Sequence, residues 1–138
     1  VISSDPMNHD LMVKERMEKV QRVANYIPEL KVDGAESGKL LVVGWGGTYG
    51  HLLSAVQEVR AEGIDVSFAH FDYIMPLPKN TADVFKKFDK ILVCELNSGQ
   101  FVNYLRALMP QFKYEQFNKV QGQPFLVQEI TTAIKENF

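Results

Sequence analysis

Four glycines follow a short apolar run in the stretch Leu40-Leu-Val-Val-Gly-Trp-Gly-Gly-Thr-Tyr-Gly50. The apolar run is typical of a buried strand in a parallel sheet. The next residues, Leu52 to Val59, place apolar side chains at helical spacing. α/β proteins use a strand, a glycine loop and a helix in this order to hold phosphates and carboxylates, because backbone N–H groups are free where a helix begins. The stretch predicts an α/β fold more firmly than it predicts a ligand.

The composition limits the classes of function open to the chain. Its 138 residues suffice for one domain, and 46% hydrophobic and 23% charged residues are ordinary for a globular protein. The formal net charge of -2 argues against a partner that is nucleic acid or an acidic membrane surface. No apolar run approaches the ~18 residues of a membrane span, and the one cysteine, Cys94, has no partner for an internal disulfide. We therefore expect a cytoplasmic protein.

The first eight residues are typical of a linker, and Val1 is not an initiator methionine. We expect a piece of a longer protein, with residues 1–8 as a linker and residues 9–138 as a single domain. An amphipathic helix is predicted next, ended by Pro28. Its apolar stripe consists of Val13, Met17, Val20, Ala24 and Ile27.

Strands and helices alternate along the rest of the chain. Strands are expected near 40–43, 65–73, 91–94 and 112–117, with a brief edge strand at 30–34. Helices are expected at 48–63, just after 80, at 98–109 with Leu108 facing inward, and from Pro124 onward. This order predicts a parallel sheet covered on both faces.

The carboxyl ends of parallel strands meet at one edge of the sheet, where α/β proteins place their sites. Four segments rich in Gly, Pro, Asn and Gln fall at these ends: 44–50, 72–78, 95–100 and 118–124. Their convergence is the strongest indication of a functional site that the pattern offers.

The glycine loop permits three interpretations. Gly44-x-Gly46 resembles the start of the dinucleotide fingerprint G-x-G-x-x-G, but Tyr49 stands where the fingerprint needs its third glycine. Asp72 stands about where an acid that binds ribose would fall. A tight packing turn is the favoured interpretation, followed by an amide cradle for a carboxylate or phosphate near Thr48. A nicotinamide or flavin nucleotide site is the least favoured.

No self-sufficient catalytic set is found. The three histidines, at positions 9, 51 and 70, share no ligand spacing with one another or with Cys94, which argues against a metal site. His70 suits a hydrogen-bonded core residue better than a base. Glu95 suits either a general base or a partner for a lysine or a helix start, with the second more common. Trp45 suits core packing and contact with a partner or ligand equally.

Four motifs in order carry a family resemblance: the Leu40–Gly50 stretch, Tyr73-Ile-Met-Pro-Leu-Pro78, Glu95-Leu-Asn-Ser-Gly-Gln100 and Asn118-Lys-Val-Gln-Gly-Gln-Pro-Phe125. They resemble the C-terminal part of the α subunit of 2-oxoacid:ferredoxin oxidoreductases, with the 2-oxoglutarate (2-ketoglutarate) branch as the nearest match. His9 followed by Arg16 and Lys19 is similar to the helix that leads into this domain in that family.

The resemblance implies a transketolase C-terminal-like domain, a three-layer α/β/α sandwich with a mostly parallel sheet and one antiparallel strand, for which residues 30–34 are suited. The complete enzyme of this family oxidatively decarboxylates a 2-oxoacid with coenzyme A, giving acyl-CoA, carbon dioxide and reduced ferredoxin. Its thiamine diphosphate, Mg²⁺ and iron–sulfur cluster belong to other domains or subunits. The implied partners are other domains of the α subunit, the β subunit and ferredoxin.

On this resemblance the chain is an accessory and assembly domain, without catalytic residues or bound cofactors and inactive alone. Ten residues are candidates for ligand or interdomain binding: Gly44, Trp45, Gly46, Gly47, Thr48, Tyr49, Asn97, Gln100, Asn118 and Lys119. The alternative is a free-standing module that binds a small anion or nucleotide with the Gly44–Gly50 loop.

Overall fold

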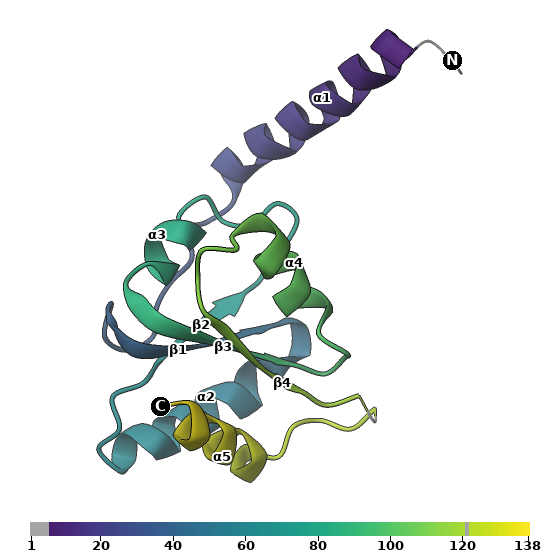
Figure 1. Ribbon diagram of the computed structural model, residues 1–138. Helices are drawn as coiled ribbons and strands as arrows, with labels where there is room; N and C mark the ends of the chain where they lie inside the picture. The colour runs from purple at the N-terminus through teal and green to yellow at the C-terminus, as the bar shows by residue number, and fades with distance from the viewer. Residues whose placement is uncertain (1–5, 121) are drawn as a thin grey trace.

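The computed structural model describes residues 6–120 and 122–138, which form one parallel four-stranded sheet with helices on both faces (Figure 1). The strand order is β2-β1-β3-β4, and each neighbouring pair runs parallel. The strands are β1 (Gly38–Trp45), β2 (Ser67–Phe71), β3 (Phe88–Glu95) and β4 (Tyr114–Asn118). Because all four run the same way, their carboxyl ends lie at one edge, as the sequence predicts.

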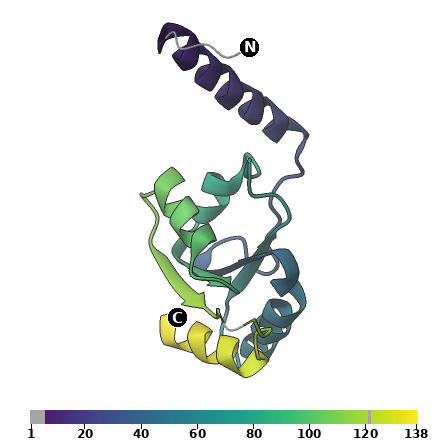
Figure 2. The same cartoon turned by 90° about the vertical axis from the view of Figure 1, so that its right-hand side faces the viewer.

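Alternating side chains of the strands supply two cores. Leu40 and Val42 of β1 pack with α2 (Tyr49–Ala61) and α5 (Val127–Asn137) on one face. Leu41 and Val43 pack on the other face with α3 (Thr81–Phe85) and α4 (Gln100–Leu108) (Figure 2). The three-layer α/β/α arrangement is therefore confirmed, and buried apolar area on both faces is what drives a parallel sheet to form.

Helix boundaries differ from the predicted ones where local hydrogen bonding decides them. Helix α5 begins at Val127 and not at Pro124, because the Glu129 carboxylate accepts the Leu126 N–H and fixes the first turn there. Leu108 is 53% exposed, and the expectation that it faces inward is wrong. Met109, the residue after α4, takes the buried position in its place.

The antiparallel strand expected at residues 30–34 is reduced to one bridge. The Asp33 N–H donates to the Phe68 carbonyl (2.7 Å), and the Phe68 N–H donates to the Asp33 carbonyl (2.9 Å). At its other end the segment is held by Asn80, whose side chain accepts the Leu30 N–H (2.7 Å) and donates to the Leu30 carbonyl (3.0 Å). Since Leu30 is tied to this side chain, the segment pairs with β2 only at Asp33.

The first helix, α1 (Pro6–Val23), extends away from the sheet and continues into a 3-10 turn, η1 (Ala24–Tyr26) (Figures 1 and 2). Residues 6–8 of the predicted linker belong to this helix, and residues 1–5 lie outside the described part. The predicted apolar stripe is present, but Val13, Met17 and Val20 are 38%, 60% and 42% exposed. No helix in the described residues is both long and apolar enough for a membrane crossing.

Candidate functional site

The turn that follows β1 contains glycines with different structural roles. A Cβ on Gly44 would overlap Leu52 Cδ1 and approach Thr48 Oγ1 to 2.8 Å, so Gly44 lets α2 pack closely on the strand. Gly46 has φ +65° and Gly47 an ordinary φ, and a Cβ on either would meet no atom within 4 Å. The Thr48 hydroxyl donates to the Trp45 carbonyl (3.0 Å) and closes the turn. The turn thus combines a packing glycine with an open stretch of backbone.

Glu95 lies at the switch point of the sheet, where the chain leaves β1 for one face and leaves the adjacent β3 for the other. Its side chain is fully buried. Oε1 accepts the Phe101 N–H (2.7 Å) and, more weakly, Trp45 Nε1–H (3.3 Å), while Oε2 accepts the Val102 N–H (2.9 Å). Glu95 was expected to be either a general base or a partner for a lysine or a helix start, and the structure shows it as the partner of the N–H groups at the start of α4.

Trp45 is half-buried, and its ring centroid lies 5.9 Å from that of Phe101. Its indole N–H therefore contacts Glu95 at the end of β3, and its ring contacts Phe101 in the first turn of α4. Beside it, Gln100 and Met75 help to line a small apolar cavity of about 110 Å³. The carboxyl ends of β1 and β3 are thus joined by side chains.

The exits of β3 and β4 form a second group. Asn97 Oδ1 accepts the N–H groups of Gly99 (2.8 Å) and Gln100 (3.2 Å) and shapes the turn into α4. Asn118 lies close to this turn, because a Cβ on Gly99 would be 3.3 Å from Asn118 Nδ2. Asn118 Oδ1 is buried and has no hydrogen-bond partner among the described residues.

Lys119 points away from the glycine turn. Its ammonium contacts both carboxylate oxygens of Glu129 (3.0 and 3.1 Å) and donates to the Pro124 carbonyl (3.1 Å). The hydrogen bond from Lys119 holds the pKa of Glu129 below its ordinary value. Since β4 lies two strands from β1, at about 4.8 Å per strand, Lys119 stands apart from the proposed amide cradle of Gly46–Tyr49.

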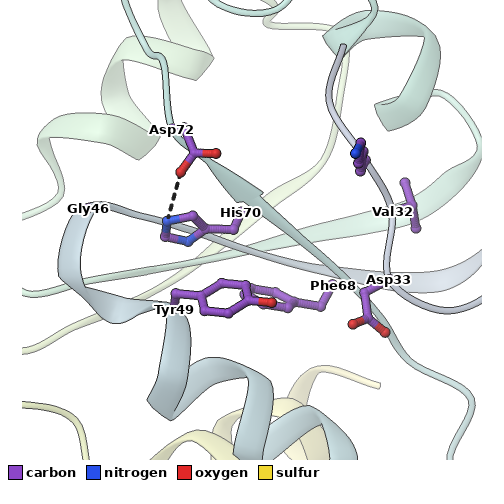
Figure 3. A pocket seen from close by; sticks show the side chains of 8 residues that line it. Val32, Asp33, Gly46, Tyr49, Phe68, His70 and Asp72 are labelled. Carbon is purple, nitrogen blue, oxygen red and sulfur yellow. Dashed lines mark ion pairs between the residues drawn. The ribbon is translucent and has the colours of Figure 1, made fainter. Parts of the chain in front are cut away.

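A cavity of about 710 Å³ opens on the outer side of the turn, beside the edge strand β2 (Figure 3). Gly46 and Tyr49 reach it from the turn, and His70 and Asp72 from the end of β2. Its far side is formed by the segment Lys31–Asp33.

Two aromatic rings of this cavity, those of Tyr49 and Phe68, lie against His70. The Tyr49 ring lies 5.2 Å from His70, edge-on, and 5.8 Å from Phe68. Burial lowers the pKa of His70, while the Asp72 carboxylate, 3.8 Å from Nε2, and the Gly46 backbone oppose that shift. Nδ1 is buried and makes no hydrogen bond of normal geometry within the described residues. His70 therefore lies at the edge of the core, with the Gly46 backbone and the Asp72 carboxylate as its polar neighbours.

Sequence reasoning missed the segment Lys31–Asp33 as part of this cavity. The one available signal was the antiparallel edge strand implied there, since such a strand has to lie beside an edge of the sheet. Asp33 is fixed by Arg60, whose Nη1 lies 2.7 Å from its carboxylate and whose Nη2 donates to its carbonyl.

The donor groups of the described residues do not fit an iron–sulfur cluster or a Mg²⁺ site. No three His, Cys, Asp or Glu side chains in that part of the chain gather closely enough to hold a metal ion. Cys94 is fully buried, and burial, with the neighbouring Glu95 charge, raises the pKa of its thiol far above the usual value. A thiol so held does not supply a thiolate ligand.

Comparison with known proteins identifies the family. A family model described as pyruvate:ferredoxin oxidoreductase core domain II matches residues 38–130. The chain belongs to this family. The matched range holds the sheet, α2, α3, α4 and the first turn of α5, while α1 and the rest of α5 lie outside it.

Two curated relatives match almost the whole chain. The chain is 37% identical over 139 residues to the 2-oxoglutarate oxidoreductase subunit KorA of Mycobacterium tuberculosis, covering 97% of this chain and 20% of the relative. It is 26% identical to the 2-oxoacid:ferredoxin oxidoreductase 1 α subunit of Aeropyrum pernix, covering 96% and 22%. The chain therefore spans about a fifth of the length of these relatives.

Solved structures agree with the fold. The chain matches a 2-oxoglutarate:ferredoxin oxidoreductase from Magnetococcus marinus, solved with 2-oxoglutarate, coenzyme A and succinyl-CoA bound, with a TM-score of 0.85 and 29% identity. That match covers 98% of this chain and 24% of the other. A split-gene transketolase matches with a TM-score of 0.60 at 13% identity, over 78% of this chain and 41% of that one, which supports the transketolase-like fold alone.

Proposed function

We propose that the chain is an accessory and assembly domain of the α subunit of a 2-oxoacid:ferredoxin oxidoreductase, of the 2-oxoglutarate type. The observation that carries the proposal is the 37% identity to KorA across nearly the whole chain. The match to the Magnetococcus marinus enzyme, which bears coenzyme A and 2-oxoglutarate, adds support.

In this proposal the complete enzyme converts a 2-oxoacid and coenzyme A to acyl-CoA and carbon dioxide, and ferredoxin takes up the electrons. In the same proposal, thiamine diphosphate, Mg²⁺ and the iron–sulfur cluster are held by other domains or subunits. The chain contributes no catalytic residue. We place the enzyme in the cytoplasm, where a single unpaired cysteine is ordinary.

The strand-end edge is the surface that we assign to assembly. Four large apolar side chains are exposed there: Tyr49 (49%), Tyr73 (49%), Met75 (74%) and Leu96 (38%). Exposed apolar side chains that gather at one edge are typical of a surface covered by a partner. Below them, Glu95 and Asn97 fix the backbone with hydrogen bonds, so this edge is presented in one conformation. The proposed partners are the rest of the α subunit and the β subunit.

Activity of the complete enzyme tests the proposal. The whole gene that carries this chain is expressed with its β subunit, and ferredoxin reduction is followed with 2-oxoglutarate and coenzyme A, with pyruvate for comparison. We expect faster reduction with 2-oxoglutarate. Absence of reduction with either 2-oxoacid contradicts the assignment.

Assembly is tested in the same preparation with two variants. Met75→Asp places a charge on the strand-end edge and should weaken association with the β subunit. Leu108→Asp changes an equally apolar, 53% exposed side chain at the far end of α4 and serves as the matched control. Equal association of both variants contradicts the assignment of this edge to assembly.

The second candidate is a free-standing module that binds a small anion or nucleotide with the glycine loop, favoured by the cavity beside Gly46. The gene upstream of Val1 separates the two candidates. A thiamine-enzyme domain encoded there supports the oxidoreductase, and a start codon directly before Val1 supports the free-standing module.

A further inference from the structure

The cavity at the outer edge of β2 shares Tyr49 with the strand-end edge but has polar groups that the assembly role does not use. It lies at the carboxyl ends of β1 and β2, on the side of the glycine turn that faces away from Glu95. Its volume of about 710 Å³ falls within the usual range for small-molecule sites. Its outer wall is fixed at both ends, by the bridge to β2 at Asp33 and by the hydrogen bonds between Leu30 and the Asn80 side chain.

One wall of the cavity is aromatic. Tyr49 and Phe68 lie with ring centroids 5.8 Å apart at 34°, and Tyr49 is still 49% exposed. The Tyr49 ring therefore retains surface on which a planar group can stack. Figure 3 shows Tyr49 and Phe68 between Asp72 at one end of the cavity and Asp33 at the other.

The carboxylates at the two ends of the cavity, Asp33 and Asp72, differ in whether they are free to bind a ligand. Asp33 is paired with Arg60 and so is already satisfied. Asp72 is 80% exposed, and within the described residues its carboxylate has one charged neighbour, His70 Nε2, at 3.8 Å, beyond hydrogen-bond distance. Its oxygens remain available to a ligand with O–H or N–H donors.

The turn after β1 contributes main-chain groups that a ligand in the cavity can reach. Gly46 lines the cavity, and a Cβ placed there would meet nothing within 4 Å, so a ligand group can approach its main chain. Helix α2 begins three residues later, and the N–H groups of a first helical turn favour negative charge.

We propose that this cavity binds a nucleotide, with the base stacked on Tyr49, the sugar hydroxyls donating to Asp72 and the phosphate over the backbone at Gly46. The order of elements along the sheet edge supports this proposal. A glycine turn follows β1, helix α2 begins after that turn, and Asp72 comes just after the adjacent strand β2. Tyr49 in place of the third fingerprint glycine then supplies the stacking surface. The site shares Tyr49 with the strand-end edge that we assign to assembly, and its binding test does not depend on the oxidoreductase assignment.

Two sources of the nucleotide are tested together: a free nucleotide, and the nucleotide part of coenzyme A. The full 138-residue chain is titrated by calorimetry with adenosine, 2′,3′-dideoxyadenosine, ADP, coenzyme A and inorganic phosphate. We expect adenosine and ADP to bind, and phosphate alone not to compete with adenosine. Displacement of adenosine by coenzyme A assigns the source to coenzyme A, and failure to displace it assigns a free nucleotide.

Variants locate the site. Tyr49→Leu removes the stacking surface and should weaken adenosine binding about tenfold. Tyr73→Leu is the matched control, because Tyr73 is also 49% exposed, follows Asp72 directly and does not line the cavity. Circular dichroism confirms that each variant is folded.

The sugar contact has its own test. Asp72→Ala should weaken adenosine about tenfold and leave dideoxyadenosine, which lacks the hydroxyls, unchanged. Three results overturn the proposal: no binding of adenosine or ADP at millimolar concentration, equal loss in Tyr73→Leu and Tyr49→Leu, or equal loss of both nucleosides in Asp72→Ala.

Discussion

Replacing Glu95 with glutamine should lower the free energy of unfolding by about 2–4 kcal/mol. The buried carboxylate accepts two backbone N–H groups at 2.7 and 2.9 Å and the Trp45 indole at 3.3 Å. Glutamine keeps one oxygen and presents an NH₂ group where the second oxygen stood, so one N–H at the start of α4 loses its acceptor. The magnitude combines a lost hydrogen bond to a charged group with a buried donor left unpaired.

The assay is urea denaturation followed by the fluorescence of Trp45, the one tryptophan in the chain. Because the indole N–H contacts Glu95, the native emission should also change in Glu95→Gln. Glu58→Gln, at an exposed position of α2, is the control and should stay within about 0.5 kcal/mol of the parent. If Glu95→Gln is as stable as this control, the switch point is not held together as we describe.

Two further predictions concern the outer side of the glycine turn. Gly46→Val should lower the free energy of unfolding by on the order of 1–3 kcal/mol, because valine is strained at φ +65°. Gly47→Ala should change thermal stability little, because Gly47 has an ordinary φ and open space around it, and equal melting temperatures of the two variants would refute this. Burial lowers the pKa of His70, so the folded state binds fewer protons than the unfolded one. The stability from His70 is therefore present above the usual pKa of 6.5 and is lost as pH falls from there through the lowered pKa. His70→Gln should flatten the melting temperature between pH 5 and 7, and an unchanged slope would contradict the role of burial.

The fold could be read from the sequence because its signals are local and repeated. The branched apolar run at Leu40–Val43 marks a strand buried on both faces, and the helix expected to end at residue 63 is followed there by Gly63 at φ +88°. A parallel sheet follows from the alternation of strands and helices, and this places all four exits at one edge.

The side-chain contacts at that edge could not be read from the sequence, because they depend on partners distant in the chain. Glu95 and Trp45 are fifty residues apart, and only the sheet order brings them together. Lys119 was grouped with the glycine turn on the family resemblance, yet its ammonium pairs with Glu129 of α5. The Asn80 side chain holds the segment at Leu30 by a hydrogen bond, and no local sequence pattern predicts this contact.

Hydrogen exchange tests the central claim most directly: that the strand-end edge is the assembly surface of a 2-oxoacid:ferredoxin oxidoreductase subunit. Amide exchange is compared between the 138-residue chain and the enzyme assembled from the complete gene and its β subunit. We predict slower exchange in residues 72–78 and 96–100 on assembly, with the loop at 62–66, at the opposite edge of the sheet, as the internal reference. Slowing confined to that reference loop, or no change at the strand ends, would contradict the claim.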